Sequence, residues 1–266
     1  MIAFSDIAAG TLRHLRYILC DIDDTVTTEG KLTARAYSAM ERLSDAGFSV
    51  IPITGRPGGW CDHIARMWPV AGVVGENGAF YFRYDVKHRV MQRRFWLDET
   101  ERRASRARLE TLRTEILAAV PRAGIASDQP YREADLAIDF AEDVGPLGRA
   151  EIDRIVALFE AAGATAKISS IHVNGWFGEH DKLTTSLALL DEVFGIDART
   201  DPAQVVFVGD SPNDAPMFAH FPNAVGVANI ARFADTLDHL PRFVTAGAGA
   251  DGFAEFARIL LGRRGE

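Results

Sequence analysis

The chain has 266 residues, of which 47% are hydrophobic and 25% are charged, so it can form one large domain or a main domain with a smaller insert. Its net charge of −8 argues against nucleic acid as the main partner, because phosphate backbones attract basic surfaces. A small anionic substrate stays compatible with this charge, since a local cation overrides it.

The cysteines and the N-terminus indicate the cellular compartment. Cys20 and Cys61 form no CxxC pair and lie near no group of histidines with the spacing of zinc ligands. We therefore expect both to be thiols in the core of a protein from a reducing environment. The first residues lack the apolar segment of a signal peptide, and no apolar run approaches the roughly 20 residues that span a bilayer. We therefore expect a cytoplasmic protein that makes no membrane contact.

Strands and helices alternate in the first 83 residues. The apolar runs YILC (17–20) and FSVIPIT (48–54) predict two buried strands. Between them, LTARAYSAMERLSDAG (32–47) has apolar residues at helical spacing and ends on a glycine that favours a helix end. A second helix is predicted over GGWCDHIARMW, followed by the strands AGVVG and AFYFR with a Glu-Asn-Gly turn between them.

The middle of the chain, from about residue 84 to 176, is richer in Arg and Glu. A long helix is predicted from near Asp98, where Glu101 completes a capping-box pattern, to before Pro121. Its many arginines predict a solvated face. RAEIDRIVALFEAAG predicts another helix, and LAIDF, AKISS and IHVNG predict strands. The alternation in LAIDF predicts a sheet that has helices on one face and an open second face.

The last third repeats the pattern of the first. KLTTSLALLDEVFGI predicts an amphipathic helix, QVVFVGD a buried strand that ends in an acid, AVGVAN and RFVTA further strands, and GFAEFARILLG a closing helix. Buried β-branched strands that alternate with helices indicate a parallel sheet covered on both faces. We therefore predict an α/β main domain, residues 1–83 and 178–266, with an inserted α/β domain, residues 84–177.

Polar residues follow three of the predicted strands. They are Asp21, Asp23 and Asp24 after the first, Thr54, Gly55 and Arg56 after the second, and Asp210, Asn213 and Asp214 after the strand QVVFVGD. Since ligands bind at the carboxyl ends of the strands in an open parallel sheet, we expect one site there. Lys182 opens a predicted helix, where the helix dipole disfavours a cation, and this favours an anionic partner.

Such crowded carboxylates repel one another, and a hard divalent cation relieves the repulsion. Mg²⁺ accepts oxygen ligands from carboxylates, carbonyls, waters and a substrate phosphate. We expect the remaining phosphate oxygens to meet Lys182, the Thr54 hydroxyl and backbone N–H groups. One carboxylate then attacks phosphorus to form an aspartyl-phosphate, and a second one, two residues on, moves the protons.

These segments resemble the motifs of the haloacid dehalogenase superfamily of phosphotransferases. DIDDT resembles the first motif, DxDx[TV], ITGRP the second, Lys182 the third and GDSPNDAPMF the fourth. GENGAFYF and the insertion resemble type IIB members, which carry a large α/β cap. The chain departs from the pattern at Asp24, where relatives often have Gly or Asn, and at Leu183, where many have Gly.

The resemblance implies a Rossmann-like, doubly wound parallel sheet core with an inserted α/β cap domain. It implies that Asp21 is the nucleophile and Asp23 the general acid/base. Asp21, Asp210 and the carbonyl oxygen of Asp23 would ligate Mg²⁺, with Asp214 bound directly or through water. The phosphate-binding residues that it implies are Thr54, Gly55, Lys182 and Asn213.

Several residues keep two interpretations. Arg56 contacts the substrate or pairs with an acid, Asn77 contacts the substrate or serves only as an Asn-Gly turn, and Asp214 alternatively caps a helix. His172 and Asn174 share one side of a predicted strand and either face the substrate or form a solvent-facing strand edge, which is favoured for each residue taken singly. Asp24 is expected to be a turn or cap residue.

The predicted function is a Mg²⁺-dependent phosphatase for a small phosphomonoester, a sugar phosphate, because a large cap that closes over a site excludes bulky ligands. A phosphomutase and a signalling receiver phosphorylated on Asp are the alternatives. Asp23 and the cap argue against the receiver. The expected partner is a small phosphorylated substrate, without nucleic acid or membrane, and the oligomeric state is open.

Overall fold

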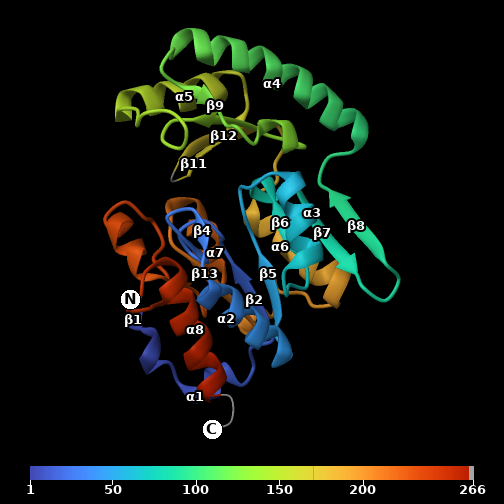
Figure 1. The fold of residues 1–266 in the computed structure, drawn as a ribbon, viewed down its shortest axis with the longest axis vertical. Helices are drawn as coiled ribbons and strands as arrows, with labels where there is room; N and C mark the ends of the chain where they lie inside the picture. The colour runs from blue at the N-terminus through green and yellow to red at the C-terminus, as the bar shows by residue number, and fades with distance from the viewer. Residues whose placement is uncertain (170, 264–266) are drawn as a thin grey trace.

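A six-stranded sheet forms the centre of the main domain in the computed structural model, which describes residues 1–169 and 171–263 (Figure 1). Its strands, in spatial order, are β1 (Ile2–Ala3), β15 (Phe243–Val244), β14 (Val225–Gly226), β13 (Val205–Gly209), β2 (Tyr17–Cys20) and β5 (Ser49–Pro52). Every neighbouring pair is parallel. The predicted α/β fold with a buried parallel sheet is therefore confirmed.

Helices cover both faces of this sheet because alternate side chains of each strand point to opposite faces. Ile18 and Cys20 of β2 lie in one apolar cluster, and Leu19 lies in another. Helices α2 and α8 contribute to the first cluster, and α6 and α7 to the second. The helices of the main domain are α1 (Ala9–Leu12), α2 (Ala34–Asp45), α3 (Gly58–Met67), α6 (Lys182–Phe194), α7 (Ala215–His220) and α8 (Gly249–Arg263).

Two smaller antiparallel sheets complete the main domain. One is the hairpin of β3 (Thr27–Thr28) and β4 (Lys31–Leu32), and the other joins β6 (Val73–Gly75), β7 (Phe80–Asp85) and β8 (Val90–Phe95). The sequence did not predict the hairpin or β8, whose polar residues give no buried-strand signal. Because β8 pairs with β7, this sheet continues past residue 84, and the domain boundaries at residues 84 and 177 stay a prediction.

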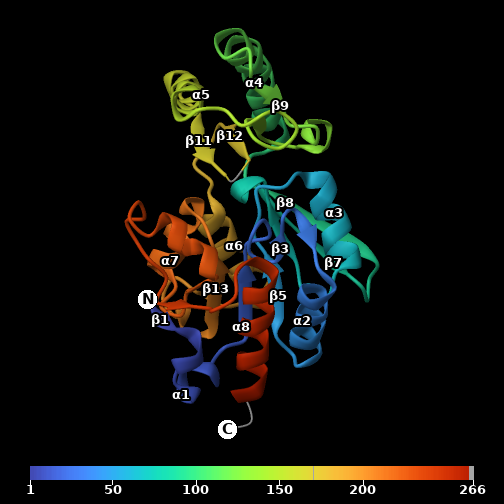
Figure 2. The same cartoon turned by 60° about the vertical axis from the view of Figure 1, so that its left-hand side comes forward.

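The smaller layer above the main domain, which we call the cap, consists of two helices and a four-stranded antiparallel sheet (Figures 1 and 2). Its elements are α4 (Glu99–Ala119), β9 (Gly124–Ile125), β10 (Leu136–Asp139), α5 (Arg149–Ala161), β11 (Thr165–Ile168) and β12 (His172–Trp176). Asp98 and Glu101 form the predicted capping box at the start of α4. Of the predicted strand AKISS, the last residue, Ser170, lies outside the described residues.

The two faces of the cap sheet have different partners. Leu136 and Ile138 of β10 and Val173 of β12 pack with α4 and α5 in one apolar cluster. Figure 2 shows the helices on the outer side and the strands toward the main domain. The predicted open face is wrong, because the main domain covers it and Asp135, Asp139 and Asn174 are buried.

Short 3₁₀ helices connect several of these elements. They are η1 (Phe4–Asp6), η2 (Glu76–Gly78), η3 (Gln129–Tyr131), η4 (Pro202–Gln204), η5 (Pro212–Asp214) and η6 (Ala228–Phe233). The predicted strand AVGVAN is accordingly shorter in the structure, since only Val225–Gly226 pairs and η6 begins at Ala228. In the described part of the chain, no helix combines the length and apolar character needed to cross a membrane.

Replacement of Gly175 by alanine should destabilise the cap. A Cβ atom at Gly175 would collide with the buried ring of Phe159 of α5. We expect Gly175→Ala to lower the free energy of unfolding in urea by about 1–3 kcal/mol, as overpacking of a core does. Gly145→Ala is the matched control, because Gly145 lies in an exposed cap loop with open space around its Cβ position. Equal stability of the two variants would contradict this packing.

Candidate active site

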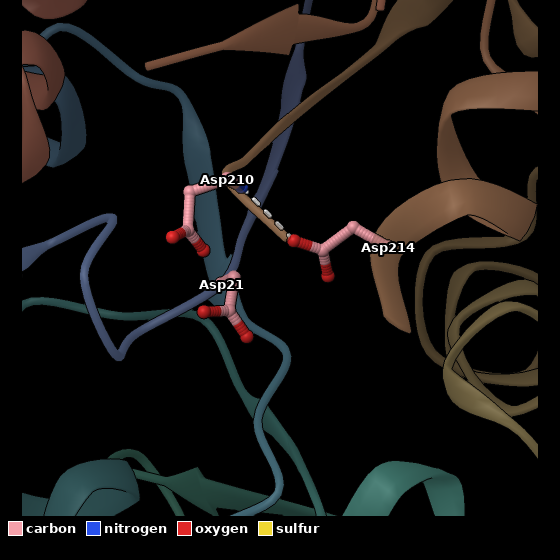
Figure 3. A group of neighbouring side chains, drawn as sticks. All are labelled: Asp21, Asp210 and Asp214. Carbon is pink, nitrogen blue, oxygen red and sulfur yellow. Dashed lines mark hydrogen bonds between the residues drawn. The ribbon is translucent and has the colours of Figure 1, made fainter. Parts of the chain in front are cut away.

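Three carboxylates meet at the carboxyl edge of the central sheet (Figure 3). Asp21 directly follows β2 and Asp210 directly follows β13, and these strands are neighbours, so their ends bring the two side chains together. Asp214 approaches from η5. One oxygen from each of the three lies within 4.8 Å of the others, and all three residues are buried. The structure thus brings together three of the predicted metal ligands, whereas the side chain of Asp23 is directed elsewhere.

Lys182 joins this cluster from the first turn of α6. Its Nζ donates to Asp21 Oδ1 at 2.6 Å and to Asp214 Oδ1 at 2.8 Å, and the residue is only 4% exposed. Burial lowers the pKa of the ammonium group, but the charges of Asp21 and Asp214 outweigh that effect and raise the pKa above its ordinary value. Lys182 is therefore charged and is placed to meet an anion bound at Asp21.

The remaining charge of the cluster favours a divalent cation. Burial raises the pKa of Asp21 to about 8, with Asp214 and Asp23 adding to the rise and Lys182 opposing it. Burial likewise raises the pKa of Asp210 to about 9, and Asp21 and Asp214 add to it. Three buried carboxylates thus surround the single ammonium group of Lys182, and carboxylate oxygens in such a group are the ligands that hard divalent ions prefer. The residues present thus fit a divalent cation.

Asp210 and Asp214 have fixed orientations. Asp210 accepts hydrogen bonds from Thr25 Oγ1 at 3.3 Å and from Asn229 Nδ2 at 2.7 Å. Asp214 Oδ2 accepts the backbone N–H groups of Asp210 at 3.0 Å and Ser211 at 3.3 Å. Asp214 also occupies the N-cap position of α7, as the alternative predicted, but its side chain makes no cap hydrogen bond to that helix.

The residues after β5 form a second wall. Thr54 is buried, and its Oγ1 accepts the N–H of Arg56 at 3.0 Å. Asn77 has a positive φ of 54°. Its side-chain amide lies against Gly55, since a Cβ atom added to Gly55 would be 3.2 Å from that amide. Gly55 and Asn213 line a cavity of about 40 Å³ together with Asp21 and Asp23, but Thr54 and Asn77 do not line it.

Arg56 binds the side chain of Asp23. Its Nε and Nη2 donate to Asp23 Oδ1 at 3.1 and 2.9 Å, and Nη1 lies 3.3 Å from Glu142 and 3.7 Å from Asp128 of the cap. Arg56 also lines the cavity, so both of its predicted roles are compatible with the structure. Asp24, in contrast, occupies a turn with a φ of 57°, as predicted, and is not among the three clustered carboxylates.

The cap supplies the opposite wall of the cavity. Asn174 Nδ2 donates to Asp135 at 2.9 Å, and His172 Nε2 lies 2.9 Å from Glu142. Both His172 and Asn174 are 3% exposed and line the cavity, so the alternative of a solvent-facing strand edge is wrong. Burial lowers the pKa of His172, and the charge of Arg132 adds to the effect.

Two ionic residues that the sequence analysis missed join the cap to the main domain. Arg132 pairs with Asp128 and Asp135 within the cap, and its Nη1 donates to the carbonyl oxygen of Gly55 at 3.0 Å. Glu76, buried beside Asn77, accepts the backbone N–H groups of residues 133, 134 and 135 and that of Gly58. The alternating charges of QPYREAD were the available signal for Arg132.

Comparisons with known proteins agree with this architecture. Residues 18–104 match the family of haloacid dehalogenase-like hydrolases, which confirms the resemblance and the predicted hydrolase class. No curated protein sequence matches the chain.

Solved structures share the fold over nearly the whole chain. Protein 0175 of Thermoplasma acidophilum is 18% identical with a TM-score of 0.69, covering 93% of this chain and 98% of its own. The sucrose-phosphatase of Synechocystis sp. PCC6803, solved with sucrose and phosphate, is 15% identical with a TM-score of 0.64, covering 93% and 98%. The subclass IIB sugar phosphatase BT4131 is 13% identical with a TM-score of 0.64, covering 93% and 99%.

Replacement of Glu76 by glutamine should loosen the attachment of the cap. Each carboxylate oxygen accepts two backbone N–H groups, so an amide NH₂ would face N–H donors. We expect Glu76→Gln to lower the free energy of unfolding by about 1–3 kcal/mol and to speed hydrogen exchange of the Ala134 and Asp135 amides. Glu115→Gln on the exposed face of α4 is the control. Unchanged exchange at residues 134 and 135 would refute the tether.

Proposed function

We propose that this haloacid dehalogenase-like hydrolase is a Mg²⁺-dependent phosphatase that hydrolyses a small phosphomonoester, a sugar phosphate, through an aspartyl-phosphate. The observation that carries the proposal is the convergence of Lys182 and Asp210 on Asp21 at the carboxyl edge of the sheet. The fold likeness to sugar phosphatases supports the class of substrate. Two buried free cysteines support a reducing compartment and hence a cytoplasmic location.

Asp21 and Asp210 would hold the cation, with the carbonyl oxygen of Asp23 and the side chain of Asp214 beside it. The bound cation supplies positive charge that offsets the carboxylates and the phosphoryl group during transfer. Lys182 neutralises a further phosphate oxygen next to Asp21. Gly55 and Asn213 bind the phosphate at the cavity wall, and Thr54 holds the loop in place.

The two halves of the reaction use Asp21 and Asp23 in turn. An oxygen of Asp21 forms a bond to phosphorus while the bond from phosphorus to the alcohol oxygen breaks, and Asp23 gives its proton to that oxygen. In the second half, Asp23 takes a proton from water as the water oxygen attacks phosphorus, and the bond to Asp21 breaks. Arg56, which binds Asp23 through two nitrogens, holds this carboxylate beside the leaving oxygen.

The nucleophile assignment predicts the effect of isosteric replacement. Asp21→Asn should reduce hydrolysis of a panel of sugar phosphates by at least about 10³-fold, because the amide cannot form the phosphoenzyme. Asp24→Asn is the matched control, since Asn tolerates the positive φ of this turn, and it should keep activity within about threefold.

The measurement is phosphate release with Mg²⁺ and with EDTA. Full activity of Asp21→Asn would overturn the assignment of the nucleophile. Interconversion of sugar phosphate isomers without phosphate release would replace the phosphatase by a phosphomutase. A phosphoenzyme that lasts for minutes with negligible turnover would indicate a receiver.

Binding of Mg²⁺ should stabilise the fold through the same carboxylates. At a free concentration about 100 times its dissociation constant, the ion should add about 2.7 kcal/mol to the free energy of unfolding. Asp210→Asn should remove most of this gain, because it removes a ligand, whereas the exposed Asp45→Asn should retain it. Thermal unfolding with and without Mg²⁺ measures the effect, and an equal gain in both variants would place the ion elsewhere.

A further inference from the structure

The space around the catalytic groups is too small for a whole substrate. The cavity that Asp21, Asp23 and Asp210 line measures about 40 Å³, which is room for only a few waters. Pockets that hold whole ligands usually measure roughly 300–1,000 Å³. With the cap in this position, the cavity therefore accepts a phosphoryl group, and the alcohol part of the substrate must extend into neighbouring space.

A larger pocket of about 380 Å³ adjoins this cavity and shares Asp23 and Arg56 with it. We call it the α3 pocket. Its other lining residues include Ile22, Leu32 of β4, Trp60, His63 and Ile64 of α3, and Trp68. Another pocket, of about 540 Å³, shares Ser169, Asp210 and Ser211 with the cavity and is not lined by Asp23. Because the alcohol oxygen must lie next to the acid that protonates it, the alcohol extends toward the α3 pocket.

The α3 pocket has the chemistry of a ring-binding site. Ile22 and Ile64 are 4% and 3% exposed and form an apolar floor, and two indoles stand at its sides. Trp60 is 44% exposed, and its ring lies 4.6 Å from the guanidinium carbon of Arg56. The indole is thus held next to the residue that binds Asp23, while much of its surface remains free for a ligand. Indole faces bind flat rings and the C–H faces of sugars.

The pocket wall opposite α3 is fixed to the catalytic loop. The β3–β4 hairpin turns at Glu29 and Gly30, whose φ angles of 51° and 69° suit a tight two-residue turn. Thr27 at its base donates to the Ile22 carbonyl at 3.1 Å and accepts the N–H of Asp24 at 3.1 Å. The hairpin therefore keeps its place relative to Asp23, and such a preformed site binds at a low entropic cost.

We propose that the α3 pocket is a specificity subsite that binds a ring of the leaving alcohol, with Trp60 as its stacking residue. This inference rests on the proposed phosphatase function. The shared ligand chemistry is a ring that presents an apolar face, and its source is either an aromatic group or a second sugar ring. The substrate is then a phosphomonoester in which at least one carbon separates such a ring from the ester oxygen.

Paired substrates with similar leaving oxygens test the subsite. Ethyl phosphate is compared with phenethyl phosphate, and glucose 6-phosphate with maltose 6′-phosphate, each with Mg²⁺. For at least one pair, kcat/KM of the wild type should be about tenfold higher for the member with the additional ring. A preference in the first pair alone identifies an aromatic ligand, and a preference in the second pair alone identifies a second sugar.

Variants of Trp60 separate stacking from general damage. Trp60→Ala should remove most of the preference, because its kcat/KM should fall about tenfold more for the ring-bearing member of the pair than for the other member. Trp60→Phe should restore part of the preference. Met67→Ala, at a 64% exposed position of α3 outside the pocket, should keep the full preference.

The possible failures are distinguishable. Hydrolysis without a ring preference, or an equal loss for both members in Trp60→Ala, overturns the subsite and leaves the phosphatase proposal standing. No hydrolysis of any of the four esters overturns the proposed function and the subsite with it.

Discussion

The site depends first on the buried ion pair between Lys182 and Asp21, which Asp214 shares. Removal of carboxylates from water costs several kcal/mol each, and an ammonium group at the start of a helix is disfavoured by the helix dipole. The ion pair offsets both costs, because each charge stabilises the other. The position of Lys182 is set by Asp181, which caps α6 through the N–H of Thr184 at 2.6 Å. A side chain at Gly78 would collide with the Asp181 backbone, so this glycine lets α6 approach the sheet.

The same short segment, Glu76–Gly78, also fixes the cap. Gly78 contacts the start of α6, and the Glu76 carboxylate binds the backbone of residues 133–135. Asp135 in that cap loop then orients Arg132, whose Nη1 reaches the carbonyl oxygen of Gly55. A change at this segment thus reaches both the lysine beside Asp21 and the cap wall of the cavity. The cap and the main domain are therefore coupled through hydrogen bonds between side chains and backbone groups.

The sequence predicted what local pattern determines. Apolar runs located the central strands except β1, and the Asp98–Glu101 capping box located the start of α4. The polar residues after the strands located Asp21 and Asp210, and the start of a predicted helix located Lys182. Apart from the residues gathered at the strand ends, it did not predict contacts between segments far apart in the chain. Asn229 binds Asp210 across 19 positions, and Arg56 binds Glu142 across 86, and neither residue carries a local signal for its partner. The wrong prediction of an open cap face has the same origin, because alternation identifies a polar face but not what covers it.

Charge balance explains why this arrangement of acids needs a partner. The carboxylates around the cavity outnumber its cations. The acids are Asp21, Asp23, Asp128, Asp135, Glu142, Asp210 and Asp214, and the cations are Arg56, Arg132 and Lys182. Both arginines are engaged with acids of their own, which leaves Lys182 as the cation next to Asp21. A phosphate ester would add negative charge to this excess, and at short range in a buried site that repulsion is strong. A phosphate bound here would therefore need accompanying positive charge, which the oxygens of Asp21 and Asp210 are placed to hold.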